Sequence, residues 1–303
     1  MTAAHWRADR TLYWPIPSPS TDFAVPSRPL LFFSHANSFP AGTYRALFAR
    51  LESRYRIASP ERYGHDPAYP VTDGWPHLVR QAAHELALAR RGHEPVILVG
   101  HSLGGFLSLK LAAAHPQGVQ AVVMLDSPVI QGWRAAVLMA AKRVGLASRI
   151  PPASIARRRR DRFASGADAL SHFRGKAAFA QWPDAVLADY VACGLDDQCD
   201  TGAQLRFARE VEASIYGTLP HDLGRVARRL RRQAPDLPIG FIQGTHSAEI
   251  RQVGMAGTRA LVGPHVRAVD GGHLFPMEQP DATADALLGL LDDLLSPALP
   301  RAA

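Results

Sequence analysis

The sequence predicts an α/β protein with a mainly parallel, doubly wound sheet and an inserted helical cap. Short apolar runs alternate along the chain with segments of helical periodicity, which is typical of parallel strands joined by helices on both faces of a sheet. This alternation stops between Asp126 and Pro235, where a mostly helical pattern continues for longer than a loop within a compact domain. A chain of 303 residues, 47% of them hydrophobic, is long enough for one large domain with such an insertion.

Several strands and helices are expected before the insertion. Each strand candidate is a short apolar run bounded by turn residues, and these runs cover residues 29–34, 55–59, 95–100 and 119–125. Between them, helical patterns cover residues 43–55, 76–91 and 103–115. In the second of these helices, Leu78, Ala82 and Leu86 recur on one side, which indicates an amphipathic helix.

After the insertion, strands are expected at residues 238–243 and 266–269, and a final helix at 282–295. Ligands in parallel α/β folds bind at the carboxyl edge of the sheet, and the insertion follows the end of a strand. We therefore expect residues 127–235 to form a helical cap over that edge. The core is expected to comprise residues 1–126 and 236–303.

The sequence pattern favours a soluble, cytoplasmic protein in a reducing compartment. No apolar run reaches the ~18 residues of a membrane span. Residues 1–10 lack the basic-then-apolar pattern of a signal peptide, and prolines interrupt the stretch that follows. Cys193 and Cys199 are close enough in sequence to be bridged, but two cysteines form no disulfide framework. The oligomeric state cannot be read from the sequence.

No metal, cofactor or nucleic-acid partner is expected. The sequence has no ligand cluster with metal-binding spacing, and it has no Gly-x-Gly-x-x-Gly turn for a dinucleotide. The net charge is +7, but no nucleic-acid-binding motif accompanies it. The arginine-rich run at residues 157–162 could attract an anionic substrate or surface; charge runs are more often a solvated helix face.

A serine between glycines is the main candidate for a nucleophile. Residues 96–105 read V-I-L-V-G-H-S-L-G-G, so Ser102 follows a buried strand and precedes a helix. In a G-x-S-x-G turn the serine is strained and exposed, and neighbouring side chains would collide, which explains Gly100 and Gly104. The backbone N–H of Leu103 would then donate to an oxyanion at the start of the helix.

The serine needs a base, and His273 is the best candidate among the 13 histidines. It follows the last predicted strand and sits in the loop Val269-Asp-Gly-Gly-His273, whose glycines allow the ring to reach inward. His101 is adjacent to Ser102, but adjacent residues in such a turn point apart. His35 ends the first clear strand and is expected to hold loop structure.

These segments resemble the α/β-hydrolase superfamily over about residues 29–295. The resemblance lies in Ser34-His-Ala-Asn-Ser-Phe-Pro40, Gly100-His-Ser-Leu-Gly-Gly105, Met124-Leu-Asp-Ser-Pro-Val129 and Gly271-Gly-His273. It implies the α/β-hydrolase fold, a Ser–His–acid catalytic triad and an acyl-enzyme intermediate.

The resemblance leaves two candidates for the acid of the triad. Most members carry an aspartate after the next-to-last strand, where this chain has Ser247. Asp126 ends an earlier strand, at an alternative acid position that some members of the superfamily use. Glu249 would require the loop to be displaced by two residues. We favour Asp126, which would fix the tautomer of His273.

The resemblance also implies a second oxyanion donor in the loop after the first predicted strand. In this chain the loop reads His35-Ala36-Asn37, so Ala36 replaces the usual glycine. The backbone N–H of Asn37 is the expected donor. Asn37 could also be only a turn residue.

A serine nucleophile favours hydrolysis of small to medium carboxylic esters, with a small-molecule ester as the expected partner. Acyl transfer on the same triad and a non-catalytic, ligand-binding member of the fold remain as alternatives. The cap is expected to line the acyl pocket. Its aromatic residues at helical spacing are more typical of a cap core than of ligand contacts: Phe163, Phe173, Phe179 and Trp182.

Overall fold

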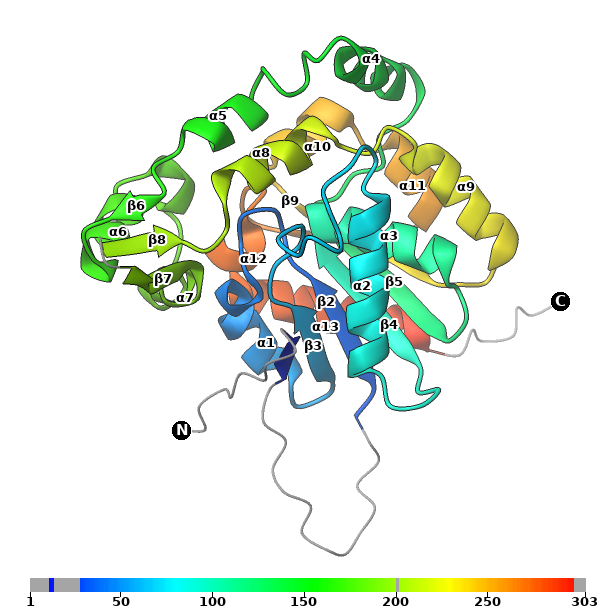
Figure 1. Cartoon of the computed structure of the whole chain (residues 1–303). Coiled ribbons are helices and arrows are strands. Elements are labelled where there is room, and N and C mark those ends of the chain that lie inside the picture. The colour runs from blue at the N-terminus through cyan, green and yellow to red at the C-terminus, as the bar shows by residue number, and fades with distance from the viewer. Residues whose placement is uncertain (1–10, 14–27, 200–201, 297–303) are drawn as a thin grey trace, which may run out of the picture.

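A seven-stranded sheet forms the centre of the protein (Figure 1). The computed structural model describes residues 11–13, 28–199 and 202–296. The strand order is β1 (Thr11–Tyr13), β3 (Arg56–Pro60), β2 (Leu30–Ser34), β4 (Val96–His101), β5 (Val119–Leu125), β9 (Ile239–Gly244) and β10 (Val266–Val269). All neighbours pair in parallel except β1, which pairs with β3 in antiparallel orientation. The predicted parallel α/β sheet is confirmed, and the short edge strand β1 was not expected.

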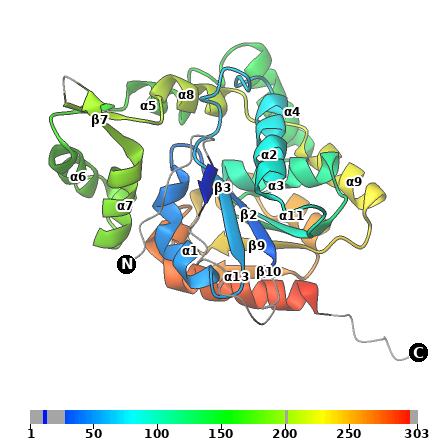
Figure 2. The ribbon, with the colours of Figure 1, turned by 60° about the horizontal axis from the view of Figure 1, so that its bottom comes forward.

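Helices cover both faces of this sheet (Figure 2). One face carries α1 (Arg45–Leu51), which follows the 3₁₀ helix η1 (Ala41–Tyr44), and α13 (Pro280–Leu295). The other face carries α2 (Pro76–Ala89), α3 (Leu103–Ala114) and α11 (Ala256–Val262). Strand side chains alternate between the two cores: Leu30 and Phe32 face α2 and α3, whereas Leu31 and Phe33 face α1 and α13. Because both faces are covered, the strands read as unbroken apolar runs.

The register of the sheet places two loops beside each other at its carboxyl edge. Ser34 at the end of β2 pairs with Gly100 in β4, so the loop after β2 and the turn after β4 start at the same level. Helix connections run in opposite directions from these two strands, which makes this the switch point where ligands bind in such sheets. His101 pairs in turn with Leu125 of β5, and Leu125 pairs with Ile242 of β9.

The insertion between β5 and β9 is helical, as expected, but it also contains a small antiparallel sheet of order β6-β8-β7. Its elements are α4 (Gly132–Arg143), α5 (Ala153–Arg158), β6 (Arg162–Phe163), α6 (Gly166–Arg174), η2 (Ala177–Phe179), α7 (Asp184–Gly194), β7 (Leu195–Cys199), β8 (Gly202–Leu205), α8 (Arg209–Gly217) and α9 (Leu223–Gln233). β6 has two residues, and the sequences of β7 (LDDQC) and β8 (GAQL) lack the apolar runs that mark the strands of the central sheet. The last helix, α9, packs on α3, and its Leu223, Ala227 and Leu230 belong to a core of the central sheet. The boundaries at residues 126 and 235 stay a prediction.

The aromatic residues of the insertion pack against one another. Phe173 has its ring centre 5.5 Å from Phe163 and 5.1 Å from Phe179, and Phe179 lies 4.7 Å from Trp182. Phe39, in the loop after β2, contacts Phe179 and Trp182 at 6.5 and 5.7 Å. These rings therefore form a cap core, as the sequence predicted, and attach that core to the loop beside the switch point.

Some predictions fall outside the described residues. These are the predictions that rest on residues 1–10 and 14–27 and on the side chain of Cys199. Cys193 is a free cysteine whose Sγ lies 3.7 Å from Thr43 Oγ1. Within residues 11–13, 28–199 and 202–296, no helix is both long and apolar enough to cross a membrane. A cytoplasmic location stays a prediction.

Candidate active site

Ser102 occupies a sharp turn between β4 and α3. Its φ of 54° lies in a region that non-glycine residues rarely adopt, and α3 begins at the next residue. A Cβ atom at Gly104 would lie 1.8 Å from the carbonyl oxygen of Ser34, and one at Gly100 would lie 2.1 Å from that of Gly104. Glycine is therefore required at both positions, because the backbone there packs directly against other backbone atoms and leaves no space for a side chain.

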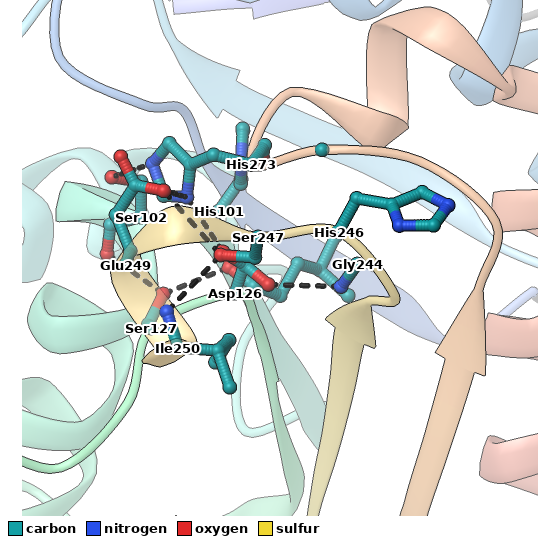
Figure 3. A network of polar contacts seen from close by, with 12 residues as sticks. His101, Ser102, Asp126, Ser127, Gly244, His246, Ser247, Glu249, Ile250 and His273 are labelled. Carbon is teal, nitrogen blue, oxygen red and sulfur yellow. Dashed lines mark hydrogen bonds and ion pairs between the residues drawn. The ribbon is translucent and has the colours of Figure 1, made fainter. Parts of the chain in front are cut away.

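His273 reaches Ser102 from the loop after β10. Its Nε2 lies 2.9 Å from Ser102 Oγ (Figure 3). The loop is held by Glu278, in the short helix α12 (Phe275–Glu278), whose carboxylate accepts a 2.7 Å hydrogen bond from the backbone N–H of Gly272. The structure thus brings together the serine and the histidine that the sequence singled out, although 171 residues separate them.

Asp126 lies on the opposite side of the imidazole. Its Oδ2 is 2.7 Å from His273 Nδ1, and its side chain is completely buried (Figure 3). Ser247 Oγ donates to the same carboxylate at 2.5 Å, and the N–H of Gly244 donates to Oδ1 at 2.9 Å. Oδ2 therefore accepts two hydrogen bonds and Oδ1 accepts one, so both oxygens of the buried carboxylate are paired.

Glu249, the other acid candidate, lies near the same histidine but does not contact it as closely. It is in α10 (Ala248–Val253), its Oε2 is 3.7 Å from His273 Nδ1, and 45% of its side chain is exposed. Its closest polar neighbour in this group is Ser247 Oγ, at 3.4 Å. Asp126, not Glu249, thus makes the direct hydrogen bond to the imidazole.

The pKa of His273 reflects burial and three acidic neighbours. Burial by itself lowers this pKa, but the hydrogen bond to Asp126 and the negative charges of Glu249, Asp126 and Glu278 outweigh burial, so the pKa is raised above 6.5. The surroundings of His273 therefore favour its protonated, imidazolium form.

His101, which the sequence analysis set aside as a base, contacts the backbone of His273 (Figure 3). Its Nε2 lies 2.8 Å from the carbonyl oxygen of His273, and its Nδ1 lies 2.7 Å from the hydroxyl of Tyr44. The same hydroxyl accepts a 3.0 Å hydrogen bond from the backbone N–H of Ala36. Burial holds the pKa of His101 well below 6.5, so the ring is neutral and donates through Nε2 to the carbonyl. A continuous chain of hydrogen bonds thus joins the loop after β2 to the backbone of His273.

The two predicted oxyanion donors lie in the two loops that the sheet register places side by side. Leu103 opens α3, and Asn37 follows β2. Among the described residues, neither backbone N–H has a hydrogen-bond acceptor of its own. The side chain of Asn37 has a different role, because its Nδ2 donates to the backbone oxygen of Glu212 at 3.1 Å and so attaches the loop to α8.

Asp126, Glu249 and His273 are also the one group, among the residues that the structure describes, whose donor atoms lie close enough to hold a metal ion, within 4.8 Å of one another. Two of the three are already joined by the hydrogen bond from His273 Nδ1 to Asp126, and Asp126 accepts two further ones. The arrangement fits a hydrogen-bonded histidine better than a set of metal ligands.

The arginine run at residues 157–162 divides between the inside and the outside of the cap. Arg159 points inward, where its Nε is 2.6 Å from Glu212 Oε2 and its Nη2 donates to the carbonyl of Phe207. Arg160 pairs with Asp168 at 2.5 Å. Arg157 and Arg158 are exposed and donate only to backbone oxygens. The run is therefore neither a uniform solvated face nor a single anion site.

A family model described as "Alpha/beta hydrolase family" matches residues 31–286. The chain belongs to that family. Its match runs from Leu31 in β2 through β10 to the first part of α13, so every residue of the candidate site lies within it.

Individual relatives agree with this family and differ in activity. A segment of 73 residues is 40% identical to lipase LipV of Mycobacterium tuberculosis, covering 24% of this chain and 28% of that protein. A 31% identical segment, covering 35% of this chain, matches 38% of 2-(acetamidomethylene)succinate hydrolase of Mesorhizobium japonicum. A crystal structure of E-2-(acetamidomethylene)succinate hydrolase superposes with a TM-score of 0.68 at 22% identity, over 88% of this chain and 92% of that one. The matched segments thus span well under half the length of these two sequence relatives. At 22% identity, the likeness to the crystal structure shows the fold alone.

Sequence reasoning missed the residues that hold the candidate site together. Ser247 carried a signal, because it occupies the position where most relatives in the superfamily have an acid. Its hydroxyl donates to Asp126 and also caps α10 by accepting from the N–H of Ile250 at 3.2 Å. Tyr44 and Glu278 carried no signal of this kind. Nothing local marks a tyrosine in a 3₁₀ helix as a partner of His101, or a glutamate six residues beyond a glycine as a partner of Gly272.

Proposed function

We propose that this chain is a serine hydrolase that cleaves carboxylic esters of small to medium acyl groups through an acyl-enzyme. The observation that carries this proposal is the continuous hydrogen-bonded line from Ser102 Oγ to His273 at 2.9 Å and from His273 to the buried Asp126 at 2.7 Å. A nucleophile, a base and a group that orients the base stand in the order that acyl transfer requires. Family membership and relatives named lipase and hydrolase agree with it.

In the proposed reaction, Ser102 Oγ attacks the ester carbonyl carbon while His273 Nε2 takes the hydroxyl proton. The negative charge that develops on the carbonyl oxygen accepts hydrogen bonds from the N–H groups of Leu103 and Asn37. Asp126 holds the proton on Nδ1 and stabilises the imidazolium. The imidazolium then protonates the departing alcohol, which leaves the acyl group on Ser102.

Hydrolysis of the acyl-enzyme repeats these steps with water as the nucleophile. His273 takes a proton from the water, the hydroxide adds to the acyl carbon, and Ser102 leaves with the proton that His273 returns. The carboxylic acid product then dissociates, and no external cofactor enters either half of the reaction. An ester is the proposed bond because an alcohol departs more readily than an amine. Its departure therefore demands less of the imidazolium as a general acid.

The test is hydrolysis of p-nitrophenyl esters of increasing acyl length by the wild type and by Ser102→Ala. The matched control is Ser108→Ala in α3, which removes a buried hydroxyl that has no hydrogen-bond partner among the described residues. We expect a burst of p-nitrophenolate equal to the enzyme concentration and steady turnover in the wild type and in Ser108→Ala, with neither in Ser102→Ala.

Three other results would contradict the proposal. Equal rates in the wild type and Ser102→Ala would remove the serine from the reaction. A burst without turnover, followed by turnover once an alcohol or amine is added, would favour acyl transfer to another acceptor. If the wild type gives neither a burst nor turnover with any ester, a ligand-binding role gains support.

A further inference from the structure

The outer surface of the cap exposes an unusual group of apolar side chains. Among the described residues, eight large hydrophobic side chains are exposed, and six of them lie between residues 133 and 155: Trp133, Val137, Val144, Leu146, Ile150 and Ile155. These residues belong to α4, to α5 and to the segment that joins the two helices. We call this group the outer cap surface. Both helices lie along the top of the molecule in Figure 1.

Helix α4 carries the centre of the outer cap surface. Trp133, Val137 and Val144 are 66%, 57% and 73% exposed. Trp133 and Val137, four residues apart, lie on one face of α4, and Val144 directly follows the end of the helix. No residue of α4 is buried, and only Ala135 and Leu138 pack partly against the core. Exposing such side chains to water is unfavourable, so a group of large exposed apolar side chains in one segment points to an interaction site.

The charge of the same segment restricts what can bind there. Residues 127–160 contain eight arginine and lysine residues and no aspartate or glutamate. Lys142, Arg159 and Arg160 pair with carboxylates from elsewhere in the chain. The other cations of the segment form no ion pair within the described part of the chain: Arg134, Arg143, Arg149, Arg157 and Arg158. The surface is therefore apolar and positively charged at once.

We propose that the outer cap surface binds the surface of an anionic phospholipid bilayer. Cations attract the negative headgroups, while a tryptophan and aliphatic side chains on one helix face enter the boundary between headgroups and acyl chains. A nucleic acid would satisfy the charges but would leave Val137, Val144 and Ile155 in water. A second copy of this chain would bring the same uncompensated cations against one another. The bilayer accounts for both properties.

The test is sedimentation of the full chain with vesicles of phosphatidylcholine, with and without about 30% phosphatidylglycerol. We expect binding to the anionic vesicles that decreases with added salt and weak binding to the neutral ones. Trp133→Ala should lower the partition coefficient about tenfold, because an aromatic side chain no longer leaves water. Arg143→Gln and Arg149→Gln should each lower it about fivefold.

The matched control is Arg91→Gln, which removes an exposed arginine from the loop before β4, at the opposite edge of the sheet. A chain of net charge +7 could adsorb to anionic vesicles through its overall charge, and Arg91→Gln would then weaken binding as much as Arg143→Gln. That result overturns the proposal, as does binding that Trp133→Ala leaves unchanged. Absence of binding together with a dimer that Trp133→Ala dissociates assigns the surface to a second copy instead. None of these variants alters a residue of the candidate active site, so ester hydrolysis in solution should stay at the wild-type rate.

Discussion

At the scale of single residues, the buried carboxylate of Asp126 determines how the candidate site is held. It accepts hydrogen bonds from His273, Ser247 and the backbone of Gly244. A buried charge is tolerated only when it is satisfied in this way, and the donors also fix the direction in which the carboxylate faces the imidazole. The neighbouring Glu249 is half exposed and acts on His273 through its charge instead.

Asp126→Asn should lower kcat by about four orders of magnitude, because an amide at this position favours the wrong tautomer of His273. Glu249→Gln should lower kcat by less than about tenfold, since its carboxylate is 3.7 Å from Nδ1 and partly solvated. Steady-state kinetics on one p-nitrophenyl ester compares the two variants. The reverse order of effects would assign the acid role to Glu249.

The pH dependence of the reaction should report the charge of Glu249. His273 acts as a base only when neutral, so kcat/KM falls as the pH drops below its pKa, which lies above 6.5. Glu249→Gln removes a negative charge that stabilises the imidazolium, so the pKa decreases and the acid limb of the profile moves to lower pH. The control is Glu210→Gln, since Glu210 is not among the groups that shift His273. An acid limb that stays in place, or moves to higher pH, would contradict this coupling.

At the scale of elements, the contact between the start of α3 and the end of β2 fixes the distance between the two predicted oxyanion donors. Gly104 lies against the carbonyl of Ser34, with no space for a side chain. The loop that follows Ser34 is attached to α8 through Asn37 and to the cap core through Phe39. A change at this contact should therefore affect both folding and catalysis.

Gly104→Ala should reduce the free energy of unfolding by about 3 kcal/mol or more and abolish activity, because the added methyl group forces β2 and α3 apart. Gly166→Ala is the matched control, since a Cβ atom there meets nothing within 4 Å. Urea unfolding followed by circular dichroism measures both variants. A Gly104→Ala protein as stable as the wild type would show that the contact can relax without cost.

Sequence reasoning succeeded for elements that have a local sequence pattern. It failed for very short strands and for contacts between residues far apart in the sequence. The strands of the parallel sheet lie within one residue of the predicted ranges, because burial on both faces leaves a run of apolar residues in each. Ser102 and His273 could be singled out because each directly follows a recognisable strand or glycine loop, whereas Asp126 was favoured through the resemblance to the superfamily. Their catalytic roles stay a proposal. The strand β6 has two residues, too few for any periodicity. The contact of His101 with the carbonyl of His273 joins residues 172 positions apart, and nothing in either neighbourhood predicts it.

At the scale of the whole molecule, the candidate site is assembled from the carboxyl ends of strands across the entire sheet. Asn37 follows β2, Ser102 follows β4, Asp126 follows β5 and His273 follows β10. The order of these strands in space brings the four positions to one edge, although the chain between them passes through both helix layers and the cap.

The position of β10 has a consequence for how the protein loses activity. This strand has four residues, pairs only with β9 within the described sheet, and has one buried residue, Val269. Edge segments with few buried contacts open locally at a lower free energy than the rest of a domain. Opening of β10 would withdraw His273 from Ser102 while the remaining strands stay paired. We expect ester hydrolysis to be lost at a lower urea concentration than the far-ultraviolet circular dichroism signal, and coincident transitions would contradict this. The proposed catalytic base would then be the first part of the site to be lost. Activity would therefore be a more sensitive probe of local opening than any signal averaged over the chain.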